Sequence, residues 1–307
     1  VSPPGVVPQR ERRPRWICDY SWWDVNADTL PLAAMEAMQF GHALERILRE
    51  ILLADPSFGP VYLIKLDISD GFYRIAVNID DIPKLGVVYP TPPGAEPLIA
   101  FPLVLPMGWT NSPPIFSTAT ETVADLANMR LHQLLTPLPH HLDTLAASIP
   151  SPPPAPPTDM SLLLHIERDP SLPSADRPLA YNDVFVDDFV AAAQQSPPWP
   201  IDEPGEPAPI DNLQRVRRIL LHAIDDVFCP LEPSDPPERR EPVSVKKLKA
   251  GDCSWGTIKL VLGWIIDTTT LTLRLPPHRI DHLAELLDSI PRSQHRTSIK
   301  KWHQVLG

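Results

Sequence analysis

Three aspartates stand at positions that a fold does not need for its own stability. Asp67 ends the apolar run YLIKL at 62–66, and Asp187 and Asp188 stand together in VFVDDFV at 184–190. Carboxylates that converge at the ends of buried strands repel one another and raise each other's pKa unless a cation lies between them. Oxygen ligands on rigid strands suit Mg²⁺, which binds through one or two carboxylates and substrate phosphates. These acids therefore suggest two-metal phosphoryl transfer, in which one ion activates an attacking hydroxyl and the other stabilises a leaving pyrophosphate.

A simpler interpretation is open for each acid. Two residues between short β-prone segments form a hairpin turn, so Asp187 and Asp188 would be ordinary solvated turn residues. An aspartate at the end of a strand, such as Asp67, is most often a turn or cap residue. The two interpretations differ in whether the three carboxylates meet in space.

The surrounding sequence predicts the elements that would position these acids. Residues 61–77 begin as a nearly continuous apolar run, which is typical of a buried strand. Apolar residues recur at helical spacing over 33–53, and Ser112 followed by Pro113 predicts the N-cap and first residue of a helix that runs to about residue 135. We also expect a helix over 211–228, a basic loop and two strands over 246–267, and a last helix from near Asp281.

Composition bounds the remaining possibilities. The chain of 307 residues has 41 prolines against 12 glycines, which excludes a compact all-helical bundle and predicts long loop insertions. The net charge of −11 means that any nucleic-acid binding must use local basic patches, such as RERRPR at 10–15. The three cysteines are far apart and predict no disulfide framework, and the ten histidines show no metal-ligand spacing. No stretch approaches the roughly 20 apolar residues of a membrane span.

Five motifs in order resemble the reverse transcriptase of retroviruses and LTR retrotransposons, most closely the gypsy-like class. They are RPRWICDYS at 13–21, LIKLDISDGFYRI at 63–75, LPMGWTNSPPIF at 105–116, VFVDDF at 184–189 and KLVLGWIID at 259–267. The resemblance implies an α+β fold with the right-hand fingers and palm of a polymerase, in which helices back an antiparallel palm sheet. It divides the chain into fingers (1–42 and 75–110), palm (43–74 and 111–275) and the start of a truncated thumb or connection (276–307). Proline-rich insertions are expected within the palm at about 136–178, 196–209 and 230–243, and nothing in 136–178 needs to fold.

The resemblance also implies roles for individual residues. Asp67 and Asp187 would ligate two Mg²⁺ ions, for which Mn²⁺ is an alternative, with the carbonyl of Ile68 assisting and Asp188 completing the triad. The implied nucleotide-binding residues are Arg15, Asp70, Gly71, Phe72 and Met107, and the implied primer grip is Leu262, Gly263 and Trp264. Phe72 would exclude a ribose 2′-hydroxyl, while Met107 replaces the glutamine or phenylalanine usual in relatives, which leaves an apolar wall. One of Lys246, Lys247 and Lys249 would lie near the pyrophosphate, and the sequence leaves that choice open.

The implied activity is RNA-directed DNA synthesis on a primed RNA or DNA template with dNTP. The implied partners are the RNase H and integrase domains of the same polyprotein, with no membrane, in a cytoplasmic particle or the nucleus of the cell. Two alternatives remain. A decayed or domesticated copy would bind nucleic acid without catalysis, and a metal-dependent hydrolase would share the acids but leave Phe72 and the LPMGW segment unexplained.

Overall fold

The computed structural model describes residues 1–9, 12–30, 39–133, 136–151, 163–167, 176–196, 210–229, 241–290 and 298. At its centre lies an antiparallel sheet of three strands in the order β3–β8–β7. These strands are β3 (Val61–Asp67), β7 (Ala180–Phe185) and β8 (Asp188–Gln194). Because β8 is the middle strand, nearly all of its side chains are buried.

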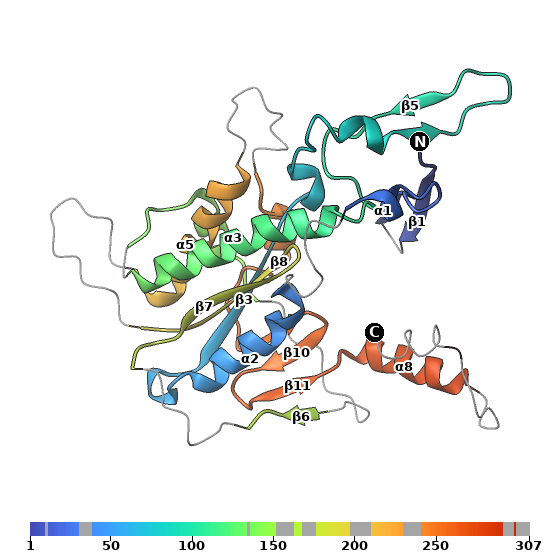
Figure 1. Ribbon diagram of the computed structural model, residues 1–307. Helices are drawn as coiled ribbons and strands as arrows, with labels where there is room; N and C mark the ends of the chain where they lie inside the picture. The colour runs from blue at the N-terminus through green and yellow to red at the C-terminus, as the bar shows by residue number, and fades with distance from the viewer. Residues whose placement is uncertain are drawn as a thin grey trace.

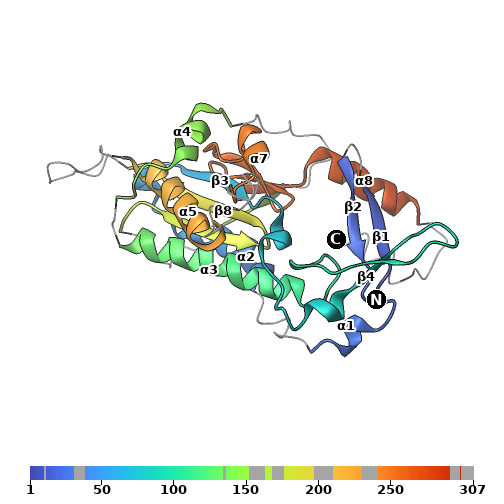
Figure 2. The same cartoon turned by 90° about the horizontal axis from the view of Figure 1, so that it is seen from above.

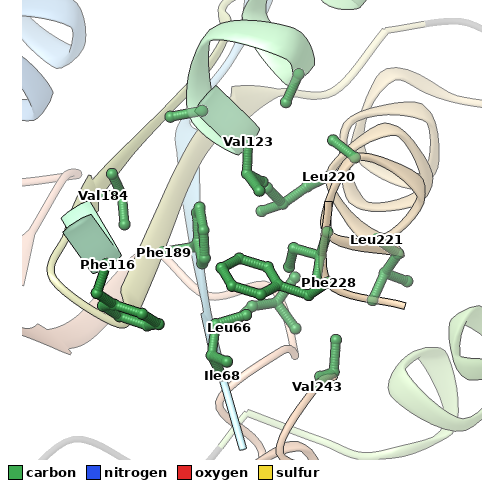
Figure 3. Close-up of a cluster of buried hydrophobic side chains, with 14 of the residues drawn as sticks. Leu66, Ile68, Phe116, Val123, Val184, Phe189, Leu220, Leu221, Phe228 and Val243 are labelled. Atoms are coloured by element: carbon green, nitrogen blue, oxygen red, sulfur yellow. The ribbon is translucent and has the colours of Figure 1, made fainter. Parts of the chain in front are cut away.

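Helices cover one face of this sheet. α3 (Ser112–His132) and α5 (Asn212–Phe228) pack side by side against it (Figure 1). Side chains from both helices, such as Phe116 and Leu220, meet Leu66 and Phe189 from the strands in the larger core cluster (Figure 3). The alternate residues Leu63 and Val190 point to the opposite face. The period-two alternation that defines a strand thus assigns each residue to one of two cores.

The second face is covered by α2 (Ala43–Leu53) and by a second antiparallel sheet. That sheet has the order β6–β11–β10–β9, in which the strands are β6 (Leu163–His165), β9 (Ile258–Val261), β10 (Trp264–Asp267) and β11 (Thr272–Arg274). Ile47 and Ile51 of α2 join Val261 and Ile266 in the smaller core cluster. The central sheet is therefore enclosed on both faces.

The N-terminal part forms two hairpins away from the central sheet (Figure 2). One pairs β1 (Pro4–Gln9) with β2 (Arg12–Cys18), and the other pairs β4 (Val87–Tyr89) with β5 (Leu98–Ala100). The remaining helices are α1 (Val25–Asp28), α4 (His141–Ser148), α7 (Val245–Lys249), α8 (Pro277–Asp288) and the 3₁₀ turns η2 (Gln39–His42), η3 (Pro56–Phe58), η4 (Gly71–Arg74) and η5 (Ile82–Leu85). No helix in the described ranges combines the length and apolar character needed to cross a membrane.

The structure confirms the mixed class of helices and antiparallel sheets, but several predicted details were wrong. The segment 136–178 contains α4 and β6, because Leu142 and Ala146 bury one helix face and β6 pairs with β11. The expected basic loop at 246–249 is the helix α7, whose Leu248 is buried. The N-cap of α3 is Asn111, since the Ser112 hydroxyl donates to the carbonyl of Pro106 instead of capping the helix. The last helix begins at Pro277, four residues before Asp281.

Candidate active site

Two of the three predicted acids face each other across paired strands. Asp67 is the last residue of β3 and Asp188 is the first residue of β8, and the register places them directly opposite each other. Directly opposed residues of an antiparallel pair have Cβ atoms about 4.5–5.5 Å apart. The strand ends therefore bring two carboxylates together, which random turn positions would not do.

The hairpin that carries the second acid differs by one residue from the prediction. Phe185 pairs with Asp188, so the two turn residues are Val186 and Asp187 rather than Asp187 and Asp188. The reason is that Asp188 extends β8 to pair with Asp67 as well. Val186 has φ 57°, which fits the first central position of a primed hairpin turn but is costly for a β-branched residue. Of the two aspartates, Asp187 alone is thus a turn residue, and its carbonyl accepts a hydrogen bond from the Ile68 amide (3.2 Å).

The acids influence one another electrostatically. Asp67 is 8% exposed. Burial raises the pKa of Asp67 to about 6, and the neighbouring charges of Asp187 and Asp188 act in the same direction. Lys247 opposes these effects without cancelling them. Burial is thus the main reason for the raised pKa, and repulsion from the two neighbouring acids adds to it.

Lys247 is the lysine that reaches the acids. Its Nζ donates to Asp67 Oδ1 at 2.5 Å and lies 3.6 Å from Asp188 Oδ1. Burial lowers the pKa of Lys247, but the hydrogen bond and the charges of the three aspartates outweigh it, so the pKa is raised. Lys246 and Lys249 on the same helix are exposed. The structure therefore distinguishes Lys247 among the three lysines that the sequence could not separate.

Backbone hydrogen bonds hold α7 in this position. The amide of Ser244 donates to the carbonyl of Asp67 (2.8 Å), and the amide of Ser69 donates to the carbonyl of Pro242 (2.8 Å). Val243 forms an antiparallel bridge with Ile68. Residues 242–244 consequently run beside the end of β3 through one isolated bridge and two backbone hydrogen bonds, although a proline-rich insertion was predicted to extend to about residue 243.

The loop after β3 contains the residues predicted to meet a triphosphate. Asp70 and Gly71 have φ 64° and 40°, which turns the chain sharply into η4. Arg74 stabilises this loop, since its guanidinium donates hydrogen bonds to the carbonyls of Ser69 (2.6 Å) and Glu241 (2.5 Å). Sequence reasoning missed Arg74, because its partners are backbone atoms and one of them is 167 residues away.

Phe72 packs as a half-buried residue against the larger core. Its ring meets that of Phe116 edge to face, with centroids 5.0 Å apart and an angle of 82° between the planes. An edge-to-face pair fixes the ring orientation. Phe72 directly follows the turn at Asp70 and Gly71 and is not fully buried.

The remaining predicted residues lie in two other places. The half-buried Met107 accepts a hydrogen bond from the Cys18 amide through its carbonyl (3.0 Å), which links β2 to the LPMGW segment. The side chain of Arg15 lies outside the described residues, and its backbone pairs with Val7 in the first hairpin. Met107 and the backbone of Arg15 thus belong to the N-terminal part.

The predicted primer grip shares a pocket with the acid hairpin. Leu262 and Gly263 have φ 47° and 86° and form the tight turn between β9 and β10, which Trp264 continues. A pocket of about 630 Å³ is lined by these two turn residues together with Phe185 and Asp188. Lys65 and Arg279 add positive charge to the same pocket. The cavity thus connects the acid cluster to a cationic, partly apolar wall.

The donor set suits a hard divalent ion. Three carboxylates at the end of a rigid sheet supply only oxygen atoms, and the ammonium of Lys247 already shows that this group requires positive charge. Asp67, Asp187, Asp188 and the carbonyl of Ile68 are the residues that would hold Mg²⁺ here. The histidines of the described chain take no part in this cluster of acids.

Comparison with known proteins gives likeness in structure alone. No protein-family pattern matches the sequence, and no curated protein matches it. A solved structure of a foamy viral protease-reverse transcriptase dRH in complex with double-stranded DNA is similar at 17% identity and a TM-score of 0.47, covering 100% of this chain and 35% of that one. A foamy viral protease-reverse transcriptase in complex with double-stranded DNA is similar at 17% identity and a TM-score of 0.42, covering 100% of this chain and 41% of that one. This chain therefore spans between a third and a half of the length of the two structures that it matches.

Proposed function

We propose that this chain carries the fingers and palm of an RNA-directed DNA polymerase of a gypsy-like LTR retroelement. The observation that carries the proposal is the register of β3 and β8, which places Asp67 opposite Asp188 with Asp187 in the adjoining turn. A solvated turn would not bury Asp67 or raise its pKa to about 6. The reaction is attack of a primer 3′-hydroxyl on the α-phosphate of a dNTP, directed by an RNA or DNA template.

Asp67, Asp187 and Asp188 hold two Mg²⁺ ions in this proposal, and Mn²⁺ could replace them. When bound, the ions activate the attacking hydroxyl and stabilise the leaving pyrophosphate. Lys247 then exchanges its contact with Asp67 for one with the triphosphate, to which its ammonium can donate a proton as pyrophosphate leaves. Its raised pKa keeps that proton in place until a strong base develops beside it.

The other residues orient the substrates. The turn at Asp70 and Gly71 presents backbone amides to the triphosphate, and Arg15 adds a bidentate donor. Phe72 closes the space next to the sugar and so selects deoxynucleotides, beside an apolar wall at Met107. The pocket between Asp188 and the turn at Leu262 and Gly263 receives the primer end.

The larger context follows from the same proposal. The fingers would comprise 1–42 and 75–110, the palm 43–74 and 111–275, and the start of a thumb 276–307. RNase H and integrase domains of the same polyprotein would supply further duplex-binding surface, inside the cell. Because the chain alone has a net charge of −11, it should bind template-primer weakly and with a steep dependence on salt.

Primer extension tests the proposal. The chain, and a longer version that continues past Gly307, are incubated with poly(rA)/oligo(dT), dTTP and Mg²⁺, beside Asp187→Asn as the control. Extension that disappears in the control supports a polymerase whose chemistry depends on this carboxylate. If the folded versions bind primed template without extending the primer, the decayed, non-catalytic copy is favoured. If they neither bind the template nor extend the primer, both the polymerase and the decayed-copy hypotheses are refuted.

A further inference from the structure

A second cluster of metal-ligating side chains lies where α4 begins beside the end of α5 (Figure 2). Ligand atoms of His140, His141 and Asp225 lie within 4.8 Å of one another. Glu241 joins them, since its Oε2 lies 2.6 Å from Nε2 of His141. Four side chains that commonly bind metals thus meet at one place, outside the acid cluster of the proposed active site.

His140 is the buried support of this cluster. It is 5% exposed, and its Nδ1 accepts a hydrogen bond from the Leu142 amide (3.1 Å). A neutral ring that accepts at Nδ1 carries its proton on Nε2, and Nε2 lies 2.8 Å from Oδ2 of Asp225. His140 therefore donates to Asp225 and fixes the orientation of that carboxylate. This is the way in which outer residues orient ligating carboxylates at metal sites.

The two carboxylate oxygens of Asp225 differ in their hydrogen-bond partners. Its Oδ1 is buried and has no hydrogen-bond partner among the described residues. Burial raises the pKa of Asp225, but the hydrogen bond and charge of His140 and neighbouring groups outweigh it, so the pKa lies below its usual value. The thiol of Cys229 also hydrogen-bonds to this carboxylate. Asp225 thus has one oxygen that His140 orients and one buried oxygen that no nitrogen or oxygen donor of the described residues reaches.

The two carboxylates of this cluster pair with histidines in the described part of the chain. Within the described ranges, the ion-pair partners of Asp225 and Glu241 are His140 and His141, which are charged only when protonated. Arg74 does approach Glu241, but it donates to the backbone carbonyl. A buried or half-buried pair of carboxylates is stabilised by a divalent cation more than by neutral imidazoles.

We propose that His141 Nε2, Asp225 Oδ1 and Glu241 Oε2 bind one Zn²⁺ ion, with water as the fourth ligand and His140 as the outer support of Asp225. One imidazole and two carboxylates form a donor set that zinc accepts, at about 2.0–2.2 Å from each atom. The imidazole nitrogen disfavours Mg²⁺, which prefers oxygen alone. His141 is largely exposed and Glu241 partly so. The His141 ring packs on the His140 ring with centroids 4.3 Å apart, and Glu241 Oε1 accepts a hydrogen bond from the Val243 amide (3.0 Å), so both side chains are held beside Asp225. Binding requires the 2.6 Å contact between His141 Nε2 and Glu241 Oε2 to open around the ion.

Such an ion would reinforce the region that carries Lys247. Glu241 begins the segment whose next residues bind the end of β3, through Pro242 to Ser69 and through Ser244 to Asp67. Zinc would therefore link this segment to α4 through His141 and to α5 through Asp225, and so stabilise the position of α7. The role is structural, and it is independent of whether the chain polymerises DNA.

Cobalt and zinc binding test this site directly. Co²⁺ is titrated into the chain in millimolar Mg²⁺ and followed by its visible absorption, and bound Zn²⁺ is counted by elemental analysis after gel filtration. The variants are His141→Ala and Glu241→Gln. The control is His282→Ala, because His282 is also paired with a glutamate and its side chain is 70% exposed against 63% for His141. Asp187→Asn removes one carboxylate of the active site, where added metal could also bind.

We expect one equivalent of metal in the wild type, in His282→Ala and in Asp187→Asn. His141→Ala and Glu241→Gln should weaken the affinity at least about 10-fold, as the loss of a metal-site residue does. Zinc should also raise the melting temperature of the wild type but not that of His141→Ala. The proposal is overturned if metal binds equally well to His141→Ala, if Asp187→Asn abolishes binding, or if millimolar Mg²⁺ displaces the zinc. None of these measurements requires polymerase activity, so failure of the polymerase proposal would leave them unaffected.

Discussion

Replacing Lys247 by glutamine should change stability and catalysis in ways that can be separated. The substitution removes the ammonium that lies 2.5 Å from Asp67 Oδ1 and 3.6 Å from Asp188 Oδ1. A hydrogen bond to a charged group contributes about 1.5–3 kcal/mol. Because the Lys247 side chain is 41% exposed, solvent screening brings the expected loss to about 1–2 kcal/mol. Without Mg²⁺, Lys247→Gln should therefore melt about 2–6 °C lower than the wild type.

Magnesium should reverse this loss, because the ion and the ammonium compete for the same carboxylates. In the wild type, Mg²⁺ must displace Lys247 from Asp67, and in the variant it need not. A difference of about 1–2 kcal/mol corresponds to roughly 5–30-fold tighter Mg²⁺ binding by Lys247→Gln. Loss of a general acid should at the same time lower the rate of nucleotide addition about 10²–10⁴-fold.

Melting curves across a Mg²⁺ titration and single-turnover extension provide the assays, with Lys249→Gln as the matched control on the exposed side of α7. Lys249→Gln should behave as the wild type in both. Equal Mg²⁺ affinity in Lys247→Gln and the wild type would refute the competition, and an unchanged extension rate would refute the proton donor. A loss of stability that Mg²⁺ does not restore would show that Lys247 is only a structural partner of Asp67.

Three further predictions concern residues outside this pair. Phe72→Val should lower the preference for dNTP over rNTP about 10–100-fold in kcat/KM, because the shorter side chain opens the space beside the sugar. Asp143→Asn should destabilise the fold by about 3 kcal/mol, since it leaves Arg217 and Arg218 without their buried partner. Burial raises the pKa of Asp143, but the two arginines and Gln214 outweigh burial, so the pKa is lowered. The difference in urea midpoint between the wild type and Asp143→Asn should therefore be complete above about pH 4 and vanish as the pH falls below the lowered pKa. Gly108→Ala should lower the free energy of unfolding by at least about 2 kcal/mol, because φ is 106° and a Cβ would lie 2.0 Å from the Cys18 carbonyl oxygen. Gly94→Ala, where φ is 86° and the space is open, should lower it by about 1 kcal/mol, and thermal unfolding measures both.

The sequence predicts the acid cluster because local pattern and side-chain chemistry agree there. A buried strand has to end where its apolar run ends, which places Asp67 at the edge of the sheet, and the β-prone residues around Asp187 and Asp188 require a hairpin. The exact turn was not predictable, because it depends on the pairing of Asp188 with Asp67 on a strand more than a hundred residues away. That tertiary pairing outweighs the poor fit of Val186 to a positive φ.

Other features depend on contacts that spacing does not reveal. Lys246, Lys247 and Lys249 are equivalent in sequence. The backbone contacts of Pro242, Val243 and Ser244 with the end of β3 orient α7 so that Lys247 reaches the acids. The helix α4 is short and lies among prolines, so its weak periodicity gave no signal. His140 and Asp225 are 85 residues apart, which is why the histidines showed no ligand pattern in the sequence.

The buried carboxylates of the described chain show how the fold separates structural acids from reactive ones. Asp143 is fixed by two arginines, and Asp183 by a bidentate arginine, Arg46, with Nε and Nη2 each 2.7 Å from a carboxylate oxygen. Arginine stays charged at any pH at which the protein folds, so these acids are permanently neutralised and unavailable to a metal. Asp67 instead meets a half-exposed lysine that it shares with Asp188, and its pKa remains raised to about 6. A divalent ion can bind a carboxylate whose cationic partner is displaced easily and does not return its pKa to the usual value. Among these three buried acids, that description fits Asp67 alone.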